Sequence, residues 1–214
     1  MPENLMRRLK ANNLDGDDFE QVFFHALICA SKPIVLTATN VDGKDMDSIV
    51  LKFDDYQVIS RQKHSLGPGK EKFMARGYPN YPRFDFMIGP MFIQVSVSEF
   101  VDHNRNSGEI QKAFKRPYKD IFGNIHKDRN QIECYLDEMY SGNHTAEITE
   151  GKFVVTRKDP KTGQVDNVPG FRIVYICGRD IQQKRHPKLA VELEDVAHVS
   201  FKDLKDVLFA NIFT

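Results

Sequence analysis

The chain has 214 residues, with thirty basic and thirty acidic side chains, so its formal net charge is zero. This length suits one domain with a substantial core, and the zero balance excludes a partner recognised by overall charge alone. No apolar run is long enough to span a bilayer, and the first residues lack the apolar stretch of a secretory leader. Cys29, Cys134 and Cys177 each lie in an apolar stretch, so we expect buried thiols in an intracellular reducing compartment.

Four helices are predicted. Apolar residues at helical spacing indicate a first helix from Asp17 to Cys29, which Asp17 or Asp18 would cap and Pro33 would stop. Ser200 and Asp203 form a capping box that opens a terminal helix. Two further helices are expected over 107–115 and 130–140.

Strands alternate with these helices. A nearly continuous apolar run over 171–177 is typical of a central buried strand. The strands over 49–53 and 56–60 are expected to form a hairpin around Asp54-Asp55. Shorter strands are expected over 34–38, 83–88, 91–98, 153–156 and 196–199. The interleaving predicts an α/β protein with a mixed central sheet flanked by helices.

The middle of the chain is basic. Residues 61–129 hold thirteen Lys or Arg against seven Asp or Glu, and Arg61 to Pro82 is predicted to be a long loop. One interpretation is an ordinary solvated loop. The other is a nucleic-acid surface, in which cations bind phosphates and aromatic rings stack on bases. The candidate nucleic-acid-binding residues are Arg61, Lys63, Lys70, Lys72, Arg76, Tyr78, Tyr81 and Arg83.

Two polar residues interrupt the apolar strands at 83–88 and 91–98. If these strands pair through the turn at Gly89-Pro90, Asp85 and Gln94 are expected on one side of the sheet, because side chains alternate between faces. Two oxygen-bearing side chains on adjacent strands could hold a hard cation such as Mg²⁺. The alternative is the polar face of a half-exposed strand pair.

Glu20 lies inside the apolar arc of the first helix when about 100° is allowed per residue. A carboxylate on a buried stripe is costly unless it has a cation, a donor or a metal as partner. Glu20 is therefore either a functional acid or the partner of a structural arginine.

A Glu on the first helix, an Asp on one strand and a Gln-x-Ser on the next form an order that resembles the restriction-endonuclease-like, or PD-(D/E)XK, nuclease fold. In that family the two strands supply Asp and then Glu/Gln-x-Lys. The wider context resembles the nuclease-like C-terminal domains of Crinkler-type effectors, over most of the chain from Asp17 onward. The segments that carry this resemblance are Leu66-Gly67-Pro68, Pro82-Arg83-Phe84-Asp85, 92–98, His103, 174–178 and Val199-Ser200-Phe201.

The resemblance implies a single nuclease-like domain over 1–214, with its core at about 17–209. Its activity would be phosphodiester hydrolysis with Mg²⁺ or Mn²⁺, on DNA rather than RNA, by an effector secreted from its source organism and acting in a host nucleus. The metal ligands would be Asp85, Gln94 and Glu20. His103 would be a proton donor or a structural residue.

The sequence departs from the family at one position. Ser96 replaces the motif lysine, and a hydroxyl cannot supply the positive charge that the lysine brings. Lys115 on the following helix could replace that charge. The departure leaves open a second hypothesis, an inactive nuclease-fold module that binds nucleic acid or a host protein.

Overall fold

The computed structural model describes residues 3–11, 13–58, 73–77, 84–100, 109–120, 122–140, 142–178 and 194–212. Its helices are α1 (Glu3–Lys10), α2 (Gly16–Cys29), α4 (Glu109–Ala113), α5 (Gln131–Met139) and α7 (Phe201–Ile212). The strands of the central sheet are β1 (Ile34–Thr39), β2 (Asp45–Leu51), β3 (Asp55–Val58), β4 (Phe73–Arg76), β5 (Phe86–Ile88), β6 (Met91–Ser96), β12 (Arg172–Cys177) and β13 (Ala197–Val199). A smaller sheet holds β9 (Asn143–Thr149), β10 (Lys152–Lys158) and β11 (Val165–Asn167), and a separate hairpin holds β7 (Tyr118–Lys119) and β8 (Ile125–His126).

The central sheet is mixed, as predicted. Its strand order is β2-β1-β13-β12-β6-β5-β4-β3. The strand β12 lies in the middle, parallel to both β6 and β13, and its apolar run is buried. The turn at Gly89-Pro90 joins β5 and β6 in an antiparallel pair, which confirms that prediction.

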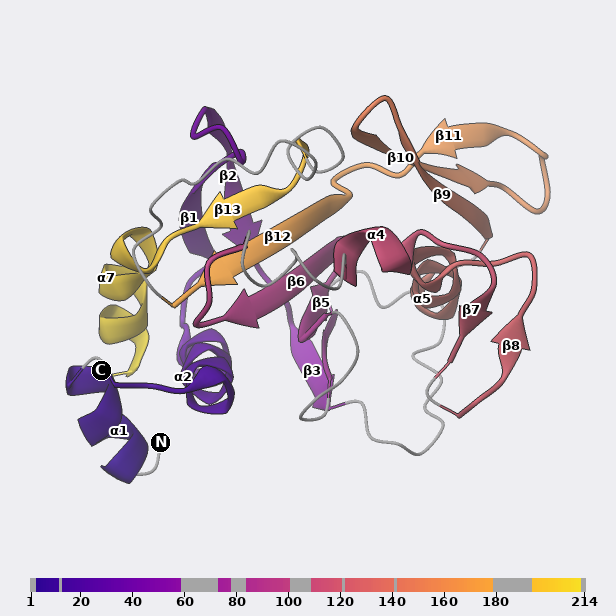
Figure 1. Cartoon of the computed structure of the whole chain (residues 1–214). Helices are drawn as coiled ribbons and strands as arrows, with labels where there is room; N and C mark the ends of the chain where they lie inside the picture. The colour runs from indigo at the N-terminus through magenta and orange to yellow at the C-terminus, as the bar shows by residue number, and fades with distance from the viewer. Residues whose placement is uncertain are drawn as a thin grey trace.

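Two apolar cores cover the two faces of this sheet (Figure 1). The first core contains Phe23 of α2 and Leu208 of α7, packed on Ile93 and Val95 of β6. The second core contains Ile132 of α5, together with side chains of α4, β9 and β10, on the opposite face. Each face of the sheet is therefore covered by different elements. A side chain of the sheet can contact only the elements on the face to which it points.

The hairpin predicted around Asp54-Asp55 is wrong. The strand β2 pairs with β1 at one edge of the sheet, and β3 pairs with β4 at the other. Only residues 52–54 join them, and so short a connection spans at most about 14 Å between Leu51 and Asp55. The sheet therefore curls around α2 until its two edges approach each other.

Two predicted details change in the structure. The predicted loop at 61–82 contains the strand β4, which forms because it finds a ladder partner on each side, β3 and β5. The N-cap of α2 is Asp15, whose side chain accepts the Asp18 N–H, and not Asp17 or Asp18. The α5 helix and the Ser200 cap of α7 are confirmed.

The three cysteines are free thiols, and Cys29 is exposed, contrary to the prediction of burial. Cys29 is the last residue of α2, so its side chain lies where the helix leaves the core. None of the helices within the described ranges is long and apolar enough to cross a membrane.

Candidate functional site

Glu20 and Arg76 pair on the α2 side of the sheet, close enough to Asp85 for both charges to act on its carboxylate, and we call these three residues the carboxylate cluster. Arg76, at the end of β4, donates hydrogen bonds from Nη2 and Nε to Glu20 Oε1 at 3.1 and 3.3 Å. Its guanidinium carbon lies 4.1 Å from the ring centroid of Phe24, so the cation also rests on an aromatic face. Arg76 is only 6% exposed.

Asp85 is held at the junction of three strands. Its N–H donates to the carbonyl of Ile93 at 2.9 Å, and its carbonyl accepts the N–H of Gly77 at 2.8 Å. Its Oδ2 accepts the N–H of Val95 at 2.6 Å. The side chain of Asp85 thus satisfies a β6 backbone donor at the point where the main-chain pairing between β5 and β6 ends. The other carboxylate oxygen accepts no hydrogen bond from the described residues.

The electrostatics of Asp85 are unusual for a carboxylate. Burial raises its pKa from 3.8 to about 7, with a further contribution from the nearby charge of Glu20, against the lowering effects of the Val95 N–H and Arg76. Burial also raises the pKa of Glu20, although Arg76 opposes the shift. The guanidinium of Arg76 pairs with Glu20 and acts on Asp85 only through its charge, so an additional proton or cation would relieve the repulsion between the two carboxylates.

A bend at Asp85 brings its carboxylate to the α2 side. Phe84 and Met87 both lie in the second core, although strict alternation would place them on opposite faces. The bend interrupts that alternation, and the charges that act on Asp85 are those of Glu20, Arg76 and Asp17. Glu20 pairs with Arg76, so it has the arginine partner that was one of the two alternatives predicted for it.

The predicted grouping of Gln94 with Asp85 does not occur. On β6, Ile93 and Val95 face the first core, so Gln94 and Ser96 alternate to the second core, away from Glu20. Both are buried. The prediction assumed regular alternation through Asp85, which the bend breaks.

The other predicted site residues are distributed differently. Lys115 is exposed beyond α4, a helix that packs on the second core, so it lies across the sheet from Glu20. Arg76 is buried in an ion pair, which corrects its predicted role as a surface phosphate contact. The remaining predicted residues lie outside the described parts of the chain: His103, Arg61, Lys63, Lys70, Lys72, Tyr78, Tyr81 and Arg83.

The pairing of Arg76 with Glu20 was missed from the sequence. A signal was present, because Arg76 ends the apolar run Phe73-Met74-Ala75, where a charged residue needs a partner. Within the described ranges, no group of three or more His, Cys, Asp or Glu side chains has the arrangement of a metal site.

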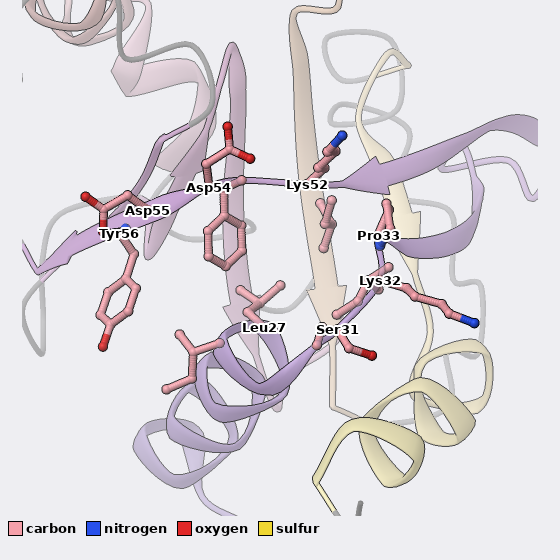
Figure 2. A pocket seen from close by; sticks show the side chains of 13 residues that line it. Leu27, Ser31, Lys32, Pro33, Lys52, Asp54, Asp55 and Tyr56 are labelled. Atoms are coloured by element: carbon pink, nitrogen blue, oxygen red, sulfur yellow. Dashed lines mark hydrogen bonds between the residues drawn. The ribbon is translucent and has the colours of Figure 1, made fainter.

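A cavity of about 380 Å³ lies at the C-terminal end of α2 (Figure 2). It opens between the end of α2, at Leu27 and Ser31, and the β2–β3 connection, at Lys52 and Asp54. Its wall residue Tyr56 packs edge-on against Phe24, and the guanidinium of Arg76 lies over the same Phe24 ring. Phe24 thus connects one wall of the cavity to the carboxylate cluster, but none of the three cluster residues lines the cavity.

Comparison with models of known protein families, with curated proteins and with solved structures found no match for this chain.

Proposed function

We propose that the carboxylate cluster is the centre of a metal-dependent phosphodiesterase that acts on nucleic acid, with DNA as the favoured substrate. The observation that carries this proposal is a pair of partly buried carboxylates near a single buried guanidinium that pairs with Glu20, with the pKa of Asp85 raised to about 7. Such a charge imbalance is costly to maintain, and perturbed acids of this kind concentrate at functional sites.

The donor set fits Mg²⁺ or Mn²⁺. Both ions prefer carboxylate oxygens, and both usually retain several waters, so two protein ligands suffice in many phosphate-handling sites. Glu20 and the second oxygen of Asp85 would hold the ion. When bound, the ion lowers the pKa of a coordinated water and neutralises charge on a phosphoryl oxygen.

Arg76 has two roles in this proposal. It orients Glu20 through two hydrogen bonds to one carboxylate oxygen. It also supplies the positive charge that the motif lysine would bring and that Ser96 cannot. Arg76 takes this role instead of Lys115, the replacement expected from the sequence. The Val95 N–H fixes Asp85, so that its second oxygen keeps a constant position.

The inactive binding module is the second candidate. It is favoured by the existing ion pair, because Arg76 already partners Glu20, and by the burial of Gln94 and Ser96 on the far side of the sheet. In that case the cluster would only join α2 to β4 and β5.

Cleavage of plasmid and oligonucleotide DNA by the wild type, Asp85→Asn and Asp45→Asn, each with Mg²⁺, Mn²⁺ or EDTA, tests the proposal. Asp85→Asn keeps the acceptor for the Val95 N–H and removes the buried charge, so a loss of activity would not reflect unfolding. Asp45 is an exposed aspartate of β2 and provides the matched control.

We expect metal-dependent cleavage by the wild type and Asp45→Asn, and none by Asp85→Asn. Equal cleavage by all three proteins would place the activity elsewhere or in a contaminant. No cleavage by any of them, together with retained DNA binding, would favour the inactive module.

A further inference from the structure

The β7–β8 hairpin presents apolar side chains to solvent at its tip. Phe122 is 47% exposed and Ile125 is 63% exposed. The hairpin lies at the end of the molecule away from both termini (Figure 1). Large exposed apolar groups on a projecting element are a marker of an interaction surface.

The tip is rigid because Asp120 organises it. Its Oδ1 accepts the N–H groups of Phe122 and Asn124, at 2.9 and 2.8 Å. Its Oδ2 binds the Asn124 amide at 2.9 Å and His126 Nε2 at 3.2 Å. Gly123 adopts a φ of 87°, which permits the tight turn. These bonds hold the backbone of Phe122, so little backbone entropy is lost when its side chain binds a partner.

The base of the hairpin is attached to the fold. Tyr118 is buried, its hydroxyl lies 3.4 Å from that of Tyr135 on α5, and its ring stacks on His126 at 5.8 Å. The other face carries the cross-strand pair Lys119 and Ile125. One face therefore anchors the hairpin, and the other remains available.

The available face carries a cation, Lys119, and other cations lie close to it in the sequence. Residues 112–129 hold six Lys or Arg against two Asp, although Arg116 and Arg129 form ion pairs with acids of α5. Lys115, Lys119 and Lys127 are exposed and make no ion pair with any residue that the structure describes. Asp120 is occupied by the turn. The hairpin is therefore a local positive surface on a chain of zero net charge, and it is complementary to an anion.

We propose that the β7–β8 hairpin is a nucleic-acid contact, in which Lys119 and Lys127 bind phosphates and Phe122 stacks on a base. Two exposed apolar side chains are far too small a surface for a standard protein interface, which buries about 800 Å² on each partner. Cations around a single fixed ring match nucleic acid, where phosphates supply the charge and a base supplies the apolar face. Both this proposal and the proposed function involve nucleic acid, but the hairpin is a different site from the carboxylate cluster.

The absence of tryptophan from the sequence makes a direct test possible. Phe122→Trp places one tryptophan at the hairpin tip, and Val165→Trp places one on the β11 strand at a position that is 59% exposed. Both proteins are titrated in EDTA, so that no metal-dependent cleavage occurs, with single-stranded DNA, duplex DNA and vesicles of anionic phospholipid.

We expect single-stranded DNA to quench the fluorescence of Phe122→Trp, and added salt to reverse the quenching. Val165→Trp should not respond. Phe122→Ser should weaken binding about tenfold or more, through the lost stacking. Lys119→Ala combined with Lys127→Ala should weaken it about tenfold, whereas Lys158→Ala combined with Lys161→Ala, on exposed lysines elsewhere, should leave it unchanged.

DNA that fails to quench Phe122→Trp overturns the proposal, and so does equal weakening by the two lysine pairs. A response to vesicles and not to DNA would identify a lipid-binding hairpin instead. If the wild type cleaves DNA while Phe122→Trp is not quenched, the hairpin proposal fails and the proposed function stands. If DNA quenches Phe122→Trp but the wild type cleaves no DNA, the hairpin proposal stands and the proposed function fails.

Discussion

Glu133 is buried and Asp85 is partly buried, and the two acids are partnered in very different ways. Glu133, on α5, is fully buried, and its two oxygens accept bonds from the Asn130 and Ala146 N–H groups and from Arg116 and Arg129. Asp85 accepts one backbone bond from the described residues, and its nearest carboxylate neighbour, Glu20, repels it.

The contrast separates a structural acid from a candidate functional one. A buried charge that is fully hydrogen-bonded fixes its surroundings, as Glu133 does when it ties α5 to β9. A buried charge with too few partners has capacity for a proton or a cation. Four experiments test whether Glu133 and Asp85 differ in this way.

Glu133→Ala should produce the largest effect. It leaves two backbone donors unsatisfied in the interior, removes the ion-pair partner of Arg116 and leaves Arg129 with Asp137 alone, so the free energy of unfolding should fall by about 3–5 kcal/mol. Urea denaturation measures this loss. Glu147→Gln, at an exposed position on β9, should change it by less than about 0.5 kcal/mol. Similar small losses for both variants would mean that Glu133 is not a structural anchor.

Asp85→Asn should have the opposite sign at neutral pH. Because the folded-state pKa of Asp85 is raised from 3.8 to about 7, the stability associated with its proton is present below pH 4 and is lost as the pH rises through about 7. Asparagine does not ionise, so the variant should be more stable than the wild type at pH 8, by up to about 4 kcal/mol, and nearly equal to it at pH 4. Urea denaturation at the two pH values checks this. A gain that is independent of pH would contradict the raised pKa.

A divalent cation should stabilise the protein more at high pH than at low pH, because metal and proton compete for Asp85. At about ten times its dissociation constant, Mn²⁺ should add about 1.4 kcal/mol to the free energy of unfolding at pH 8, and less at pH 6. Thermal denaturation with and without the ion follows the effect as a rise in Tm. Asp45→Asn should retain the gain and Asp85→Asn should lose it; retention by both would exclude Asp85 as a ligand.

Asp15→Ala tests whether the start of α2 influences the electrostatics of the carboxylate cluster, or whether α2 only positions Glu20. Loss of the N-cap should cost about 1 kcal/mol of unfolding free energy. Arg76 should still hold Glu20, so the pH dependence of stability assigned to Asp85 should be unchanged. A shift of that pH dependence in the variant would show that the helix start controls the cluster.

Local patterns identified most of the elements that build the site. The apolar periodicity of α2, the buried run of β12 and the Gly89-Pro90 turn were each readable from neighbouring residues. The two charged residues in apolar surroundings could be identified as well, since Glu20 lies on the apolar arc of a helix and Asp85 interrupts an apolar strand. Local patterns were therefore enough to single out Glu20 and Asp85, although not the buried Glu133.

The arrangement of those acids follows from the three-dimensional fold. Arg76 and Glu20 are 56 positions apart, and no short-range periodicity encodes a contact over that distance. The bend at Asp85 turns one side chain to the α2 face, while Gln94 remains on the other, and the curl of the sheet separates β2 from β3. Helical and strand patterns record which side a residue faces within its own element, whereas strand pairing and bends decide which sides come together.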